Sequence, residues 1–164
     1  MTNAQDPSLN NADSFTARIQ ALAAEVEPYV IEKRRYFHAH PELSAHEFET
    51  TKALAAELDA MDISYIRPGE TGIIATIRGE APGAYDEAGK PHHRLALRTD
   101  IDALPVTEQT GAAFASQNEG VMHACGHDCH MAMMLGAVRM LNELRSELKG
   151  EVRIIFQPAE EISI

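Results

Sequence analysis

Apolar residues recur at helical spacing in the first part of the chain. One stretch runs from Asp13 and Ser14, both good N-caps, to the residues before Pro41, and Pro28 is expected to kink or split that helix. The apolar positions of this helix are Ile19, Leu22, Ala23, Val26, Val30 and Phe37. Residues 1–13 are polar, so we expect them to form a disordered lead. The pattern thus places the first ordered element at about residue 14.

A second helical stretch is predicted from Ala45 to Met61. It is expected to be buried through Phe48, Leu54, Leu58 and Met61. Ser44 and Glu47 have the spacing of a capping box, in which two side chains satisfy the free amides of the first turn. This helix is therefore expected to carry its own N-terminal cap.

The rest of the chain alternates strand and helix patterns. Strands are predicted over Thr71–Arg78, Arg94–Thr99 and Glu151–Gln157, with a polar connection over Gly79–His93. A helix is predicted between the last two strands, over Asp128–Leu148, with one apolar stripe. This order indicates an α/β fold in which helices cover a sheet.

Charge and cysteine content exclude several classes of protein. The 164 residues include 14 basic and 25 acidic side chains, a net charge of -11, so a nucleic-acid partner and an anionic membrane surface are disfavoured. Only two cysteines occur, and the N-terminus has no pattern of a signal peptide. No apolar run reaches the roughly eighteen residues that a membrane span needs. We therefore expect a cytoplasmic protein of one domain.

Side chains that bind metals gather in three segments. His123–His130 contains two cysteines and three histidines, Asp100 and Asp102 follow a predicted strand, and Glu160 and Glu161 follow the last strand. Ligands gather at the carboxyl ends of strands in such sheets, and thiolate, imidazole and carboxylate groups together suit zinc and similar ions. The sequence therefore predicts that one rim of the sheet is a metal site.

Each segment also has a simpler interpretation. The aspartates could cap a turn, and the glutamates could be a solvated pair. Cys125 and Cys129 could form a redox pair, or the cluster could hold a structural metal ion. For His38 and His40, a structural role near a helix end is favoured over metal ligation.

The order of four segments resembles peptidase family M20, in the branch of N-acyl-amino-acid amidohydrolases, hippurate hydrolases and auxin-conjugate hydrolases. The segments are Arg34–Glu47, Arg98–Glu108, Gly120–Asp128 and Ile155–Glu161. The resemblance covers most of the chain. It implies a partial three-layer α/β catalytic domain over residues 14–164, with a mixed, mostly parallel sheet flanked by helices.

The resemblance also implies a role for each matching residue. Cys125, His127 and Glu161 match metal ligands, and Asp102 matches an aspartate that supports the metal centre. Glu160 matches a general base that takes a proton from water and passes it to the leaving amine. The implied cofactor is a pair of divalent ions, of zinc, manganese, cobalt or nickel, which activates water and polarises an amide carbonyl. The implied substrate is a small N-acyl amino acid.

Family members continue beyond the glutamate pair, whereas this sequence ends at Ile164. Two further ligand histidines and a lid domain used for dimerisation are expected downstream in the family. We therefore expect the N-terminal portion of a catalytic domain, inactive by itself, because an open coordination sphere binds metal weakly. Val152–Phe156 is expected to leave an unpaired sheet edge through which copies could associate. The alternative is a non-enzymatic module that binds metal or a partner.

Overall fold

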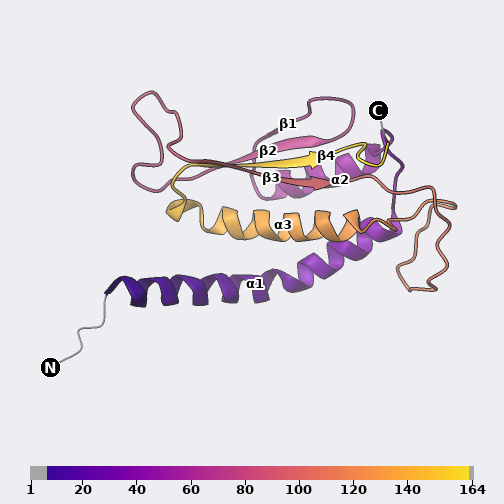
Figure 1. Cartoon of the computed structure of the whole chain (residues 1–164), viewed down its shortest axis with the longest axis horizontal. Helices are drawn as coiled ribbons and strands as arrows, with labels where there is room; N and C mark the ends of the chain where they lie inside the picture. Colours follow the sequence, from indigo (N-terminus) through magenta and orange to yellow (C-terminus); the bar gives the residue numbers. More distant parts are fainter. Residues whose placement is uncertain (1–6, 163–164) are drawn as a thin grey trace.

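The structure is a computed structural model that describes residues 7–162. Its elements, in chain order, are α1 Pro7–Ala39, α2 Phe48–Ala60, β1 Tyr65–Ile66, β2 Ile73–Arg78, β3 Arg94–Asp100, α3 His127–Glu143, a 3-10 turn at Arg145–Glu147 and β4 Glu151–Gln157. The α/β fold and every predicted helix and strand are present (Figure 1). Only the two-residue strand β1 had no prediction.

The first helix differs from its prediction in start and continuity. It begins at Pro7, a residue whose fixed φ suits the first turn of a helix, rather than near Ser14. It also continues through Pro28 as one helix, and Figure 1 shows a bend within it. The first six residues of the expected disordered lead lie outside the described residues.

The sheet is mixed, with strand order β1-β2-β4-β3. β3 and β4 are parallel and are joined through α3, whereas β2 is antiparallel to both β1 and β4. The expectation that the sheet is mostly parallel is therefore wrong for the described strands, because only β3 and β4 are linked by a helical crossover. β4 is also a central strand, so the sheet edges of the described chain belong to the two-residue strand β1 and to β3, and not to Val152–Phe156. Association through an edge stays a prediction, now for β3.

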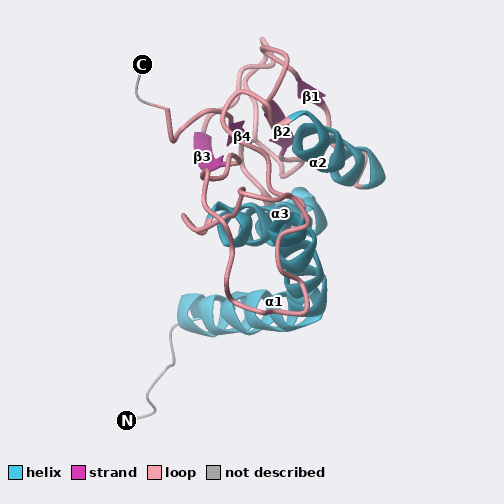
Figure 2. Ribbon diagram, turned by 90° about the vertical axis from the view of Figure 1, so that its right-hand side faces the viewer, coloured by secondary structure: helices cyan, strands magenta, loops and turns pink. Residues whose placement is uncertain are grey.

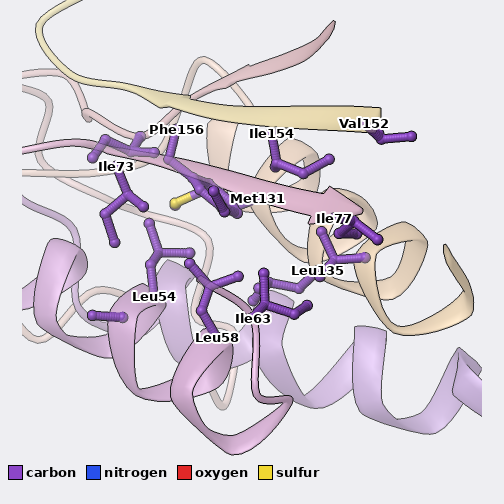
Figure 3. Packing of buried hydrophobic residues seen from close by; sticks show 14 of the residues in the cluster. Leu54, Leu58, Ile63, Ile73, Ile77, Met131, Leu135, Val152, Ile154 and Phe156 are labelled. Atoms are coloured by element: carbon purple, nitrogen blue, oxygen red, sulfur yellow. The ribbon is translucent and has the colours of Figure 1, made fainter. Parts of the chain in front are cut away.

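One face of the sheet carries the hydrophobic core. Alternate residues of β2 and β4 point to this face and are paired in register, Ile73 with Phe156 and Ile77 with Val152. Leu54 and Leu58 of α2, with Met131 and Leu135 of α3, pack against them (Figure 3); all four are 0% exposed. The core thus holds both helices on the same side of the sheet.

The opposite face of the sheet has no helix over it among the described residues. It presents Ile74, Ile155 and several charged side chains, and Ile66 of β1 is 64% exposed. α1 instead packs on the far side of α3 from the sheet (Figure 2). Helices on both faces, as a three-layer domain implies, are thus not seen among the described residues, and β4 accordingly alternates in burial over most of its length.

The predicted capping box does not form. Ser44 and Glu47 send their side chains to Asp102 and to the Ala159 amide, while the Glu42 carboxylate accepts the first-turn amides of Glu49 and Thr50. In addition, Phe48 is 41% exposed rather than buried. Tertiary hydrogen bonds have replaced the local cap.

The third helix is shorter than predicted. It ends at Glu143, and the 3-10 turn at Arg145–Glu147 leads into β4. Among the described residues, no helix is both long and apolar enough to span a membrane.

Candidate metal centre

Three loops meet at the carboxyl ends of β3 and β4. Asp102 follows β3, Cys125 and His127 lie at the start of α3, and Glu160 and Glu161 follow β4. Since β3 and β4 are parallel and α3 begins at the same rim, the fold itself brings these segments together (Figure 1).

Asp102 is fully buried and connects the other groups. Its backbone carbonyl accepts the Nδ1–H of His127 at 3.0 Å and the thiol of Cys125 at 3.7 Å. Its Oδ2 accepts the Ser44 hydroxyl at 2.7 Å and the Glu161 amide at 2.8 Å. Oδ1 has no hydrogen-bond partner in the described part of the chain and lies 3.4 Å from His127 Nδ1. One aspartate thereby orients three of the predicted ligands.

The bond to Asp102 decides which nitrogen of His127 can bind a metal. Nδ1 is occupied as a donor, so Nε2 carries the free lone pair. Nε2 faces the glutamate pair, 3.9 Å from Glu160 Oε2 and 3.8 Å from Glu161 Oε1. The imidazole is thus held in the orientation and tautomer that a metal ligand needs.

Gly126 sets the entry into α3 between Cys125 and His127. It has φ 90°, in the left-handed region that side chains disfavour. No atom lies within 4 Å of a Cβ placed there, so the requirement is conformational rather than steric. This turn places thiol and imidazole on the same side.

Within residues 7–162, two groups of donor atoms could hold a cation. The first is Cys125, His127 and Glu161, and the second is Asp100, His127 and Glu160; within each group the donor atoms lie within 4.8 Å of one another. Both groups use His127, which has only Nε2 free. The first group is the better candidate for a metal site, because its thiolate suits zinc-like ions. In the second group, Asp100 already forms an ion pair with Arg98 at 2.6 Å.

The electrostatics of the rim favour a cation. Carboxylates from Asp100, Asp102, Glu160 and Glu161 converge there, and Arg98 is the cation paired with one of them. Burial raises the pKa of the Cys125 thiol, and the negative charge of Glu161 adds to this effect. A bound divalent ion would compensate the carboxylates and displace the thiol proton. The donor set and its charge therefore fit a metal ion.

Other residues of the motif segments lie behind the rim, and His38 and His123 are buried there. His38 is hydrogen-bonded through Nδ1 to Asp128 at 2.7 Å and through Nε2 to Glu108 at 3.2 Å, so it packs as a structural residue. His123 is 3% exposed without a partner for either ring nitrogen among the described residues, and burial lowers its pKa to about 4. Cys129 is a free thiol that lines an apolar hollow beside Phe114. None of these residues joins either donor group.

Sequence reasoning missed the contacts of Ser44 and Glu47 near the site. Asp100 was expected at the rim beside Asp102, and it joins the second donor group, although the family resemblance assigned it no ligand role. Ser44 and Glu47 were assigned to a local cap, and no local pattern reveals contacts with residues more than fifty positions away. The roles of Cys125, His127, Glu161, Asp102 and Glu160 stay predictions that this geometry supports.

The fold and the rim together define an α/β domain whose sheet edge gathers the donor atoms of a candidate metal centre. Residues 96–164 match the sequence model of peptidase family M20/M25/M40, and the chain belongs to this family.

Individual relatives support the same assignment. The chain is 48% identical over 136 residues to the N-acetylcysteine deacetylase of Bacillus subtilis, a match that covers 82% of this chain and 33% of that protein. It is 42% identical over 145 residues to the N-acyl-L-amino acid amidohydrolase of Geobacillus stearothermophilus, covering 88% of this chain and 37% of the relative. The chain thus spans about a third of the length of these curated relatives.

A solved structure supports the fold as well. A dinuclear metal binding peptidase of the M20 family from Bacillus subtilis superposes with a TM-score of 0.73 at 46% identity, covering 87% of this chain and 37% of that one. The likeness confirms the catalytic-domain fold that the motifs implied.

Proposed function

We propose that this chain supplies the metal-binding rim of an amidohydrolase that cleaves the amide bond of small N-acyl amino acids. The observation that carries the proposal is the convergence of Cys125, His127 and Glu161 within 4.8 Å, with the Glu160 carboxylate beside them. The names of the two relatives, a deacetylase of N-acetylcysteine and an amidohydrolase of N-acyl-L-amino acids, support this substrate class.

Cys125, His127 and Glu161 would hold one divalent ion, of zinc, manganese, cobalt or nickel. When bound, such ions act as Lewis acids that activate water and polarise the amide carbonyl. The related peptidase of Bacillus subtilis is a dinuclear metal binding protein, which supports a second ion here, for which Asp100 and Glu160 lie nearby.

Glu160 is assigned the proton transfer. Its side chain is 41% exposed, compared with 25% for Glu161, so it can meet both water and substrate. Its Oε2 lies 3.9 Å from His127 Nε2, and its carboxylate can accept a proton from water and return it to the leaving amine. Asp102, buried beneath both, holds His127 and the Glu161 backbone in place. The 164-residue chain alone is expected to be inactive or nearly so, since three ligands leave the coordination sphere open.

A full-length chimera with one of the relatives tests the proposal. Residues 14–161 replace the matching third of the Geobacillus stearothermophilus amidohydrolase, and hydrolysis of hippurate and N-acetyl amino acids is measured. We expect metal-dependent activity in the chimera, and a fall in kcat of about 10²- to 10⁴-fold in E160Q with metal still bound. E87Q, at an exposed position in the loop that enters β3 at the opposite end of the sheet, is the matched control. A chimera that folds and binds metal, yet is inactive or is unaffected by E160Q, contradicts the proposal.

A further inference from the structure

The turn between α1 and α2 reaches across the fold to the metal rim. Ala45 has φ 63°, a left-handed conformation, and it lies between Ser44 and Glu47, whose side chains contact Asp102 and the Ala159 amide. Ser44 donates its hydroxyl to Asp102 Oδ2 at 2.7 Å, across 58 positions of sequence. The turn is thus in direct contact with the residue that orients the predicted ligands.

Glu47 holds the segment that carries the glutamate pair. Its side chain is 0% exposed, and Oε1 accepts the amides of Ala45 at 3.0 Å and of Ala159 at 2.8 Å. Ala159 directly precedes Glu160 and has φ 56°, a left-handed conformation that is unfavourable for a residue with a Cβ. A buried carboxylate therefore stabilises a strained backbone one residue before the predicted base.

The same segment is fixed at two further points. A Cβ on Gly72 would lie 2.6 Å from the ring of Pro158, so the chain packs there without spare room. The Glu161 amide donates to Asp102 at 2.8 Å. All these contacts hold backbone or ring atoms, and they leave the carboxylates of Glu160 and Glu161 free.

Helix capping does not account for Glu47. The first-turn amides of α2, those of Glu49 and Thr50, are bound by the Glu42 carboxylate at 3.1 and 2.7 Å. Instead, Glu47 Oε1 accepts the amide of Ala159, 112 positions away in the sequence. The other carboxylate oxygen, Oε2, has no hydrogen-bond partner among residues 7–162.

We propose that Ser44 and Glu47 are positioning residues for the metal rim. Glu47 fixes the Ala159 amide and so aims Glu160 and Glu161 at His127, while Ser44 holds the Asp102 carboxylate that binds the Glu161 amide. This inference rests on the proposed function, because it concerns the same ligands.

The first test is cobalt binding by the 164-residue chain. Co²⁺ is titrated, and the thiolate-to-cobalt absorption of Cys125 reports the site. Partners of metal ligands typically change affinity by about 10- to 100-fold, so E47A is expected to weaken Co²⁺ binding by that factor. E47Q is expected to restore affinity to within about threefold, because an amide oxygen accepts hydrogen bonds as a carboxylate oxygen does. E49A, at an exposed position in the first turn of α2, is the control.

S44A tests the other contact and removes a hydroxyl from a half-buried position. It is expected to weaken Co²⁺ binding in the same direction as E47A, by a smaller factor. Thermal unfolding checks that each variant folds. If E47A does not fold, E47D replaces it, since a carboxylate shorter by one methylene cannot reach Ala159 in the same geometry. Equal Co²⁺ affinity in wild type, S44A and whichever of these Glu47 variants folds overturns the inference.

The second test needs no metal and separates this inference from the proposed function. Hydrogen exchange of the Ala159 amide, followed by NMR, is expected to quicken by about tenfold or more in E47A but not in E49A. If C125S binds Co²⁺ as wild type does, the proposed metal site fails, and the exchange result still decides whether Glu47 holds Ala159. Unchanged exchange in E47A overturns the positioning role even where cobalt binds as proposed.

Discussion

The Asp102 carboxylate offers the sharpest test of how the rim is organised. D102N keeps the size of the side chain, and its amide oxygen can still accept from Ser44 and from the Glu161 amide, both of which now bind Oδ2. The new NH₂ group then takes the place of Oδ1, 3.4 Å from His127 Nδ1. A carboxylate oxygen beside an N–H donor is thereby replaced by a second donor.

The size of the effect follows from that distance. Two unit charges 3.4 Å apart interact by about 5 kcal/mol at an effective dielectric constant of ~20. A metal-bound imidazole places only part of a unit charge on its N–H, so D102N is expected to lose about 1.4–2.7 kcal/mol of binding energy. This corresponds to about 10- to 100-fold weaker metal binding at 1.36 kcal/mol per tenfold, in line with the usual effect of such partners.

The assay is Co²⁺ titration of the 164-residue chain, with thermal unfolding as a check on folding. D59N, at an exposed position of α2, removes one negative charge away from the rim and is the matched control. We expect the control to bind as wild type does, and D102N to bind more weakly with an altered cobalt spectrum. Affinity and spectrum unchanged in a folded D102N would show that the electrostatic reasoning about Asp102 and His127 is wrong.

Two further predictions concern the scaffold. A methyl group at Gly136 would lie 2.5 Å from Val30 Cγ2, where α1 crosses α3, so G136A is expected to destabilise the fold by about 1–2 kcal/mol despite its better helix propensity. In a V30A background the same change should become neutral or stabilising, and urea unfolding of the four proteins measures the coupling; additive effects would contradict the predicted clash. The Ser116 amide, followed by the Thr110 hydroxyl and His38, lowers the pKa of Glu108 from 4.5 to about 2. Because the folded-state pKa is depressed, this carboxylate stabilises the fold above about pH 4.5 and loses that contribution as pH falls towards 2. The stability advantage of wild type over E108Q should therefore shrink between pH 5 and 3, and a constant difference would refute the assigned cause.

The fold was predictable wherever burial follows the local period. Ile73 and Ile77 in β2, and Leu54 and Leu58 in α2, are buried as their spacing predicted, because each pattern directs these side chains to a single face. Pairing of the strands was not predictable in this way. β4 lies between β2 and β3, and no residue within β4 specifies its two neighbours.

The candidate site likewise combines residues that could be identified from the sequence with residues that could not. Cys125, His127 and Glu161 could be selected from the sequence because their side-chain chemistry and the order of the motifs need no coordinates. Ser44 and Glu47 could not be assigned correctly, because the spacing of a capping box is satisfied equally well by residues that bind elsewhere.

The sequence alone predicted the class of fold, the candidate donor atoms and the family, since each prediction depends on periodicity, on side-chain chemistry or on the order of motifs along the chain. Only the tertiary structure decided how those donors are oriented. In the fold, the Asp102 carbonyl accepts hydrogen bonds from Cys125 and His127, and Nε2 of His127 stays free. Glu47 accepts the amide of Ala159, directly before the glutamate pair. These contacts join residues that are distant in the sequence, and their geometry depends on how the whole chain packs rather than on any local pattern.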